Sequence, residues 1–331
     1  VLVGGMTLGV LQVFVNYTVQ FFQPIRDIAA TFAEMQSAQA AAERVMTLLE
    51  TQPDIVDSPE VEAKFGDNFH PKKENWPALK GDVEFCHVDF QYKEGEKVLS
   101  DFNLKVRAGE TIALVGPTGA GKSTVVNLVC RFYEPTAGEI KIDGVNYKER
   151  SQLWLESNLG YVLQEPRLFS GTIRDNIRYA RLDATDAEVE AAARLVNAEP
   201  FILKMDKGYD ADVGEGGSRL STGEKQLISF ARAILADPRI FVLDEATSSV
   251  DTQTEQIIQQ AISRVLTGRT SFIIAHRLST IRTADRILVI DGGKIKEMGT
   301  HQELLRLKGA YYNLYTNQFQ EEQAMELLGN K

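Results

Sequence analysis

One eight-residue stretch, Gly116–Ser123, constrains this chain more than any other. It reads Gly-Pro-Thr-Gly-Ala-Gly-Lys-Ser and matches the phosphate-binding pattern Gly-x-x-x-x-Gly-Lys-Ser/Thr at every fixed position. The preceding Thr111–Val115 is a short apolar run typical of a buried strand, and Thr124–Tyr133 carries apolar residues at helical spacing. This order of strand, loop and helix is the context that the pattern requires, so a chance glycine-rich turn is the weaker interpretation.

The loop contains the residue types that hold a chain of phosphates. Its glycines let successive backbone N–H groups turn toward phosphate oxygens, and the positive end of the following helix adds to the attraction. We predict that Lys122 reaches the outer phosphates and that Ser123 holds Mg²⁺. The predicted phosphate-contacting residues are Gly116, Pro117, Thr118, Gly119, Ala120, Gly121, Lys122, Ser123 and Thr124.

A second pattern, Ile240–Glu245, places two carboxylates after four apolar residues. The apolar run predicts a buried strand, and its carboxyl end is where open sheets bind ligands. Adjacent side chains point in different directions, so we expect Asp244 to support Mg²⁺ and Glu245 to orient and deprotonate an attacking water. Such a run is common by itself, and the phosphate loop in the same chain gives the interpretation its weight.

Composition narrows the classes of partner. The 331 residues carry a net charge of −10, and no basic block offsets it. Nucleic acid is therefore not expected as the main partner. Two cysteines, Cys86 and Cys130, are too few for a disulfide framework or a metal cluster.

The first 25 residues contain no charged residue. About 20 such residues can span a bilayer core, and no basic segment precedes the run as a signal peptide would require. We therefore expect residues 1–22 to be the last membrane helix of a longer protein, of which this chain is a C-terminal fragment. A buried helix of a soluble protein is the alternative. Apolar spacing beyond Pro24 predicts that the helix continues to about Leu49, so residues 1–50 are assigned to the end of a membrane domain.

The rest of the chain divides into three parts. Residues 51–80 hold four prolines, many charges and little periodicity, which is typical of a linker. Residues 81–318 alternate strands and helices, which predicts an α/β fold with a mainly parallel sheet, an antiparallel β part and a helical lobe at about 165–235. Thr185–Glu188 in that lobe has the capping-box pattern. Residues 319–331 form a Glu-rich tail.

Together these patterns resemble the ATP-binding cassette (ABC) family, and five further segments occur in the order of that family. They are Tyr92 for the aromatic residue that stacks on adenine, Gln164 for the Q-loop glutamine, Leu220–Glu224 for the signature, Asp251 for the D-loop and His276 for the switch histidine. The resemblance covers about residues 81–318 and implies the P-loop cassette fold.

The resemblance also implies a site shared by two subunits, because cassettes of this family pair head to tail around two ATP molecules with Mg²⁺. The implied catalytic residues are Lys122, Glu245 and His276, and the implied Mg²⁺ ligands are Ser123, Gln164 and Asp244. Ser221, Gly223 and Asp251 would reach the nucleotide held by the partner subunit.

A membrane helix, a linker and a cassette in this order resemble a half-size exporter. The resemblance implies a multi-pass protein of the cell membrane with a cytoplasmic cassette and a second half-transporter as partner. The exported substrate could be a small molecule, a lipid or a peptide. A soluble ABC-type ATPase acting as a clamp is the alternative function. A P-loop kinase or GTPase would leave the signature-like segment and His276 without a role, and the intact Glu245 argues against a binding-only cassette.

The signature departs from the family pattern Leu-Ser-Gly-Gly-Gln at two positions, Thr222 and Glu224. A carboxylate near a triphosphate is unfavourable unless it points away or pairs with a cation such as Lys225, and Thr222 adds bulk where the backbone should approach closely. We therefore predict an asymmetric heterodimer, in which a partner supplies the normal signature. A working homodimer that tolerates both changes is the alternative.

Overall fold

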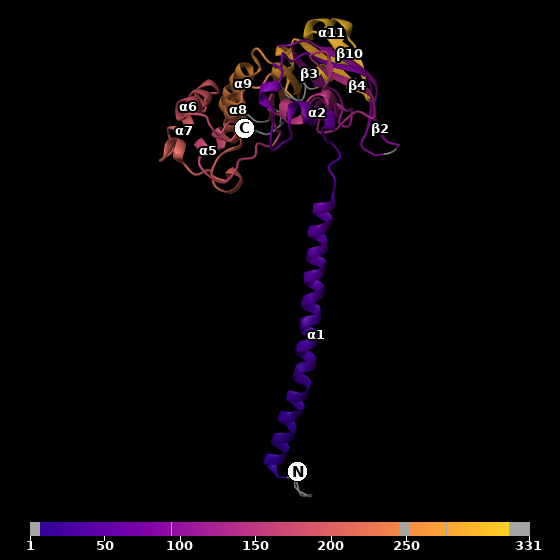
Figure 1. The fold of residues 1–331 in the computed structure, drawn as a ribbon. Helices are drawn as coiled ribbons and strands as arrows, with labels where there is room; N and C mark the ends of the chain where they lie inside the picture. The colour runs from indigo at the N-terminus through magenta and orange to yellow at the C-terminus, as the bar shows by residue number, and fades with distance from the viewer. Residues whose placement is uncertain (1–6, 94, 245–251, 276, 318–331) are drawn as a thin grey trace. The chain divides into compact units, whose positions relative to one another are not determined.

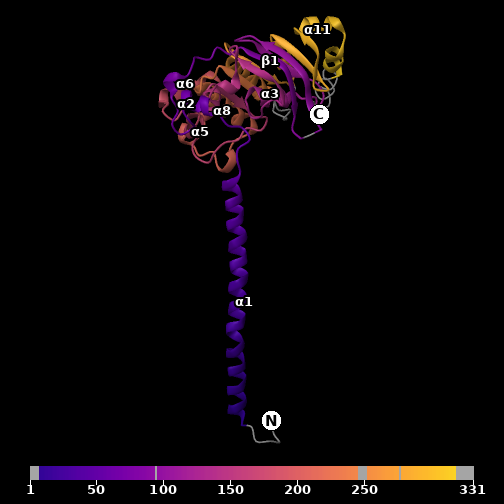
Figure 2. The ribbon, with the colours of Figure 1, turned by 45° about the vertical axis from the view of Figure 1, so that its right-hand side comes forward.

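The computed structural model describes residues 7–93, 95–244, 252–275 and 277–317. The chain divides into two compact units, Val1–Asp54 and Ile55–Lys331. The first unit contains one long helix, α1 (Leu8–Glu50), which begins where the Thr7 side chain accepts a hydrogen bond from the N–H of Val10 at 3.4 Å. It runs through Pro24 without a break (Figure 2), as the apolar spacing predicts.

Apolar side chains are exposed along α1, among them Phe14, Phe21 and Ile28. Within the described ranges, no helix is both long enough and apolar enough to cross a membrane. Residues 1–6 of the predicted membrane segment lie outside those ranges. The helical part of that prediction is present from Leu8 onward, and its membrane location stays a prediction.

The second unit contains two sheets (Figure 1). A four-stranded antiparallel sheet has the order β2-β1-β4-β5, and a six-stranded sheet has the order β10-β9-β3-β8-β7-β6. All neighbours in the larger sheet are parallel except β9 and β10. The strands are β1 (Val83–Gln91), β2 (Lys97–Val106), β3 (Thr111–Val115), β4 (Ala137–Ile142), β5 (Val145–Asn146), β6 (Leu159–Val162), β7 (Ile240–Asp244), β8 (Thr270–Ile274), β9 (Arg286–Asp291) and β10 (Lys294–Gly299).

The central strands of the larger sheet are buried on both faces. In β3, Ile112 and Leu114 belong to one hydrophobic core, while Ala113 and Val115 belong to the other. Parallel strands covered on both faces read as continuous apolar runs, which is why β3 and β7 are visible in the sequence. The predicted α/β fold with a mainly parallel sheet and a separate antiparallel part is confirmed.

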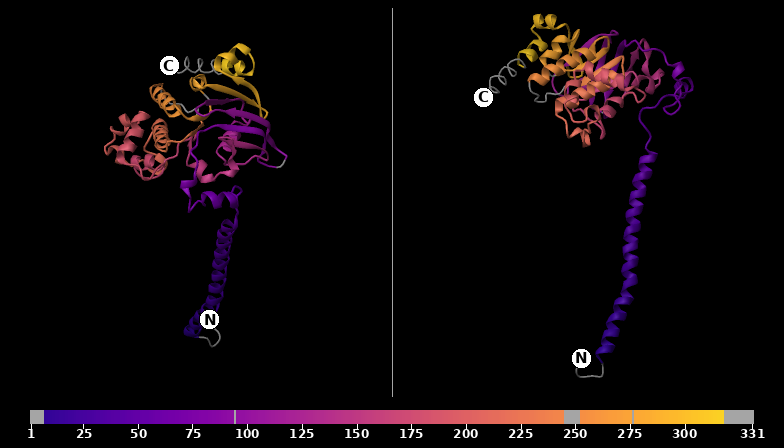
Figure 3. Two further views of the ribbon diagram at one scale, coloured as in Figure 1. Left: turned by 45° about the horizontal axis from the view of Figure 1, so that its top comes forward. Right: turned by 90° about the vertical axis from the view of Figure 1, so that its left-hand side faces the viewer.

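Helices surround the sheets, and α5, α6 and α7 gather in a lobe to one side of the strands (Figures 1 and 3). Helix α8 packs against α5, α6 and α9 and so joins the lobe to the sheet part. The helices are α2 (Pro59–Phe65), α3 (Lys122–Val129), α4 (Gln152–Glu156), α5 (Ile173–Arg178), α6 (Asp186–Leu195), α7 (Glu199–Ile202), α8 (Thr222–Leu235), α9 (Thr252–Leu266), α10 (Leu278–Thr283) and α11 (His301–Leu307), with short 3-10 turns η1 (Lys73–Asn75), η2 (Tyr147–Glu149), η3 (Gly208–Asp210) and η4 (Glu215–Gly217).

Part of the predicted linker packs into the second unit. Residues 55–80 belong to that unit, and Phe65 and Leu79 are buried in it. The indole N–H of Trp154 donates a hydrogen bond to the carbonyl of Pro77 at 2.8 Å. These partners lie far apart along the chain, so the absence of local periodicity in residues 51–80 gave no sign of them.

A buried ion pair between Asp57 and Arg131 fixes the start of residues 55–80. The Arg131 side chain, 1% exposed, follows α3, and its Nη1 donates to Asp57 Oδ1 at 2.9 Å. Its Nε donates to Glu134 Oε1 at 3.0 Å. The second oxygen of Asp57 accepts the backbone N–H of Gln152, at the start of α4, at 2.9 Å. Asp57 thus joins three segments through charge-assisted hydrogen bonds, which are the strong class.

We expect Asp57→Asn to lower the free energy of unfolding by about 2 kcal/mol, because the amide weakens hydrogen bonds made by a buried charged group. Urea denaturation followed by tryptophan fluorescence measures the change. Asp237→Asn is the control, since Asp237 pairs with Arg269 at the same 2.9 Å but its side chain is 73% exposed, where an ion pair contributes little. Equal losses in the two variants would contradict the role of burial.

Candidate nucleotide site

The loop between β3 and α3 is shaped by glycines. Gly116 has φ +146, and a Cβ there would lie 2.1 Å from the carbonyl oxygen of Ile290 in β9. Gly121 caps α3 with φ +105, a left-handed conformation that glycine adopts readily. The loop therefore passes close to β9 and turns directly into α3, so that the N–H groups of the first turn are available to an anion.

Lys122 folds back over this loop. Its Nζ donates hydrogen bonds to the carbonyl oxygens of Gly116 at 2.7 Å and Pro117 at 2.9 Å. Burial lowers the pKa of Lys122, and the nearby carboxylate of Asp244 acts in the opposite direction and offsets part of this effect. A cation is thus held at the loop by two local carbonyls, where phosphate oxygens would meet it.

The order of strands brings Asp244 to this loop. β3 and β7 both pair with β8 in parallel, so their carboxyl ends meet at one edge of the sheet. Asp244 is the last residue of β7 and is half-buried. Although Lys122 and Asp244 are far apart in sequence, the sheet brings the Asp244 carboxylate near enough to oppose the lowering of the Lys122 pKa by burial.

The three residues that the family resemblance assigns to Mg²⁺ carry oxygen donors that suit this ion. Ser123, in the first turn of α3, is exposed, and Gln164, after β6, is exposed as well. Together with Asp244 they offer a hydroxyl, an amide and a carboxylate oxygen, the hard donors that Mg²⁺ prefers. Among the described residues, no three His, Cys, Asp or Glu side chains gather to hold a metal. A nucleotide site does not need such a cluster, because Mg²⁺ takes most of its remaining ligands from phosphates and water.

Tyr92 connects the antiparallel sheet to α3, the helix that follows the phosphate loop. It directly follows β1, and its hydroxyl oxygen lies 3.1 Å from Thr124 Oγ1 in α3 in a hydrogen bond. The Nδ2 of Asn127, one turn further along α3, donates to the Tyr92 hydroxyl at 3.5 Å. The aromatic residue predicted to stack on adenine is therefore tied to the helix that carries the phosphate loop.

The signature segment begins α8, and Glu224 takes part in a capping box there. Glu224 Oε2 accepts the Ser221 backbone N–H at 2.8 Å and the Ser221 hydroxyl at 2.9 Å, while Ser221 Oγ accepts the N–H of Glu224 at 3.3 Å. The Glu224 carboxylate therefore folds back onto the start of α8 and does not point away from it. Its hydrogen bonds occupy the Ser221 hydroxyl that the family resemblance assigns to a partner's nucleotide.

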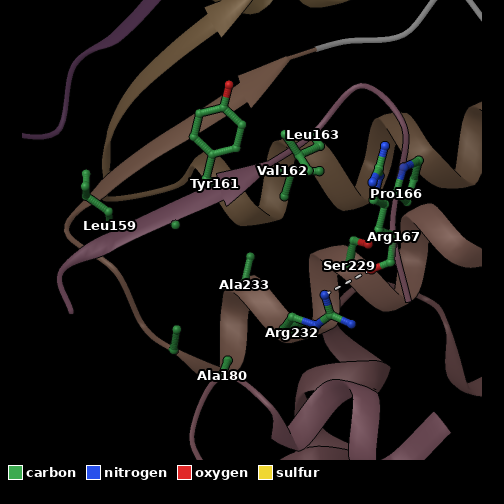
Figure 4. Close-up of a pocket in the computed structure, with 12 residues that line it drawn as sticks. Leu159, Tyr161, Val162, Leu163, Pro166, Arg167, Ala180, Ser229, Arg232 and Ala233 are labelled. Atoms are coloured by element: carbon green, nitrogen blue, oxygen red, sulfur yellow. Dashed lines mark hydrogen bonds between the residues drawn. The ribbon is translucent and has the colours of Figure 1, made fainter. Parts of the chain in front are cut away.

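The segment after β6, which contains Gln164, lies against α8. Figure 4 shows Leu163, Pro166 and Arg167 of this segment beside Arg232 and Ser229 of α8, around a cavity of about 170 Å³. The Nη1 of Arg232 donates to the carbonyl of Arg167 at 3.3 Å.

Arg232 also holds the start of the helical lobe. Its Nη2 donates to the side-chain oxygen of buried Asn176 at 2.9 Å, and Asn176 in turn bonds both backbone groups of Phe169. Arg232 and Asn176 were missed in the sequence. The signal in the sequence was Arg232 itself, a charged residue inside the apolar run Phe230–Leu235. A charge buried in such a run needs a polar partner.

Three predicted site residues, Glu245, Asp251 and His276, lie outside the described residues. The structure therefore brings together the phosphate loop, Asp244 and Tyr92, and it places Ser221 and Gly223 at the start of α8. Gly223 is buried and Ser221 is exposed.

This chain is similar to known proteins of one family. Residues 99–248 fit the family model described as ABC transporter. A relative from Bacillus subtilis (strain 168), "Uncharacterized ABC transporter ATP-binding protein YfiC", is 49% identical over 96% of this chain and 51% of its own length. A second from the same organism, "Probable multidrug resistance ABC transporter ATP-binding/permease protein YheH", is 47% identical over 94% of this chain and 44% of its own length.

A solved structure of a bacterial Atm1-family ABC exporter with ATP bound has a TM-score of 0.74 and 39% identity. The match covers 92% of this chain and 52% of the exporter chain. The present chain thus spans about half the length of the curated relatives that it matches. Residues 99–248, which hold the phosphate loop, the Asp-ended β7 and the signature helix, belong to the ABC transporter family.

Proposed function

We propose that this chain binds ATP with Mg²⁺ and hydrolyses it as one half of a cassette dimer. The observation that carries the proposal is the loop between β3 and α3, where Lys122 lies on the carbonyls of Gly116 and Pro117 at the carboxyl edge of the parallel sheet that also carries Asp244. Such a site favours the transfer of a terminal phosphoryl group to water, because it supplies positive charge and oriented N–H groups where negative charge gathers.

Each residue has a role in this proposal. Gly116–Thr124 surround the phosphates with backbone N–H groups, and Lys122 Nζ leaves its loop carbonyls to meet the outer phosphates. Glu245, next to Asp244, accepts the proton of the attacking water, and His276 aligns the terminal phosphate. Mg²⁺, when bound to Ser123, Gln164 and Asp244, supplies charge that offsets the phosphate oxygens. Tyr92 stacks on the base.

We further propose that the longer protein uses this site to drive export across the cell membrane, paired with a second half-transporter. Binding of ATP would close the cassette dimer, and hydrolysis with release would open it again. The relatives named as permeases and exporters support this direction. The exported substrate would be a small molecule, a lipid or a peptide.

Carbonate extraction of the whole protein from its native membranes tests this part of the proposal. An exporter half should remain in the membrane pellet after washing at alkaline pH. Complete release into the supernatant would favour the alternative, a soluble ABC-type ATPase that acts as a clamp. ATP hydrolysis by the cassette would be common to both, so this measurement separates them.

The signature supports an asymmetric pair in this proposal. Glu224 brings a negative charge to the helix start that would face the γ-phosphate of the partner's ATP, and its hydrogen bonds already occupy Ser221. A nucleotide would have to displace this carboxylate, against repulsion between like charges. We therefore propose that a partner chain provides the better signature. The working homodimer is the alternative, and full ATPase activity of this chain without a partner would favour it.

We expect Glu224→Gln to strengthen ATP-driven dimerisation about fivefold or more, because glutamine keeps the capping box but removes roughly 1 kcal/mol or more of charge repulsion. Sedimentation at increasing ATP concentration measures the effect.

Glu188→Gln is the matched control, since Glu188 forms the same capping box with Thr185 at the start of α6. It should leave dimerisation unchanged. If Glu224→Gln also leaves dimerisation unchanged, the carboxylate does not oppose ATP, and the homodimer is favoured.

A further inference from the structure

Three aromatic rings meet beside the phosphate-loop helix: Phe90, Tyr92 and Tyr133. Ring centroids are 4.8 Å apart for Phe90 and Tyr92 and 5.0 Å apart for Tyr92 and Tyr133, both with interplanar angles of 89°. Phe90 and Tyr133 are 5.7 Å apart at 67°. Edge-to-face contacts of this kind favour one orientation of each ring. We call these three residues the aromatic triad.

The triad is only partly a core feature. Phe90 is 3% exposed, whereas Tyr92 is 46% exposed and Tyr133 is 43% exposed. Two large aromatic side chains thus stay half in water while they contact each other and a buried ring. Burial alone does not account for this arrangement, but a flat ligand that stacks on one of the two rings would.

Contacts of Arg131 and Tyr147 hold the backbone around Tyr133 in place. Arg131, with φ +56, turns the chain sharply after α3, and its side chain is anchored to Asp57 and Glu134. The hydroxyl of buried Tyr147 donates to the carbonyl of Tyr133 at 3.4 Å. The chain reversal therefore returns Tyr133 to α3 beside Tyr92, on a backbone that has little freedom to move.

We propose that Tyr133 is a positioning residue for base recognition, and that it holds the Tyr92 ring ready for a planar base. This inference rests on the proposed function, in which Tyr92 stacks on adenine. Tyr92 is fixed at its hydroxyl end by Thr124 and Asn127, but a hydroxyl bond alone leaves the ring free to rotate about its long axis. The perpendicular rings of Phe90 and Tyr133 together restrict that rotation, so the entropy of ordering Tyr92 is not lost again when the base binds.

The test compares a ligand that has a base with one that has none. Affinities of the 1–331 chain for ATP and for inorganic tripolyphosphate, both with Mg²⁺, are measured by calorimetry for the wild type, Tyr133→Phe and Tyr133→Ala. We expect Tyr133→Ala to weaken ATP roughly three- to tenfold, the range of one aromatic pair, and to leave tripolyphosphate binding unchanged. Tyr133→Phe keeps the ring and should bind both as the wild type does.

Phe132→Ala is the matched control. Phe132 is adjacent, it is 46% exposed, and its ring packs on Tyr161 at 5.8 Å and not on the triad. It should leave the preference for ATP over tripolyphosphate unchanged. In steady-state hydrolysis, Tyr133→Ala should raise KM for ATP and keep kcat, whereas general damage to the fold would lower kcat as well.

The inference alone fails if Tyr133→Ala leaves the preference for ATP over tripolyphosphate intact, either by weakening both ligands equally or by weakening neither. Either result counts against the inference only if Tyr92→Ala removes the preference and Lys122→Ala weakens both ligands, since the proposed function then stands. If the wild-type chain shows no preference for ATP over tripolyphosphate, stacking on Tyr92 fails, and the inference fails with it.

Discussion

Replacing Glu245 with glutamine should slow ATP hydrolysis by at least about 100-fold and leave ATP binding intact, because a general base contributes a factor of that size or more. ATP held without hydrolysis should then accumulate in any pair of cassettes able to close on it. Phosphate release measures the rate, and light scattering with and without ATP measures the dimer. Glu188→Gln, in the helical lobe, is the control and should hydrolyse ATP at the wild-type rate.

The dimer measurement also decides between the two proposed pairings. A dimer of Glu245→Gln with ATP would mean that Thr222 and Glu224 serve in a working signature, which favours the homodimer. A monomer that still binds ATP would indicate a missing partner. Adding Thr222→Gly and Glu224→Gln should then restore pairing. If the restored chain stays monomeric, the signature does not explain the lack of pairing.

Replacing Lys122 with alanine should weaken ATP binding by at least about 100-fold, since an ammonium close to phosphates in a partly buried site contributes several kcal/mol. The wild-type Nζ lies within hydrogen-bonding distance of two loop carbonyls, so the cation is at the loop before a phosphate arrives and has only to turn toward it. Binding of a fluorescent ATP analogue, with competition by ATP, measures the loss.

Lys148→Ala serves as the control for Lys122→Ala. Lys148 pairs with Glu134 at 2.8 Å and its side chain is 42% exposed, so its loss should leave ATP binding unchanged. Thermal unfolding of both variants separates a loss of binding from a loss of fold. ATP binding at the wild-type level in Lys122→Ala would refute the role assigned to this lysine.

Local patterns were sufficient for much of the fold and for the phosphate loop. β3 and β7 appear in the sequence as continuous apolar runs because both of their faces are covered. The loop that follows β3 shows itself by glycines at fixed spacing, since only glycine fits where Gly116 approaches β9. The helical lobe predicted at about 165–235 corresponds to α5–α8, which span residues 173–235.

One local signal was available and was not used. Ser221 and Glu224 have the same capping-box spacing that predicted the start of α6 at Thr185. From the sequence, Glu224 was interpreted only as a charge near a phosphate. The structure shows the same carboxylate bonded to Ser221, so one side chain stabilises its helix and occupies a predicted nucleotide contact.

By itself the sequence determined the α/β class, the phosphate loop, the Asp-ended strand and the capped start of α6. Each of these depends on residues within a few positions of one another, whose spacing follows the periods of strand and helix. Only the tertiary structure decided that Asp57 pairs with Arg131 and that Tyr133 returns to Tyr92. It also decided that Lys122 and Asp244 lie at the same edge of the larger sheet. Those contacts depend on the order of strands in the sheet and on chain reversals, which bring distant residues together without leaving a local period in the sequence.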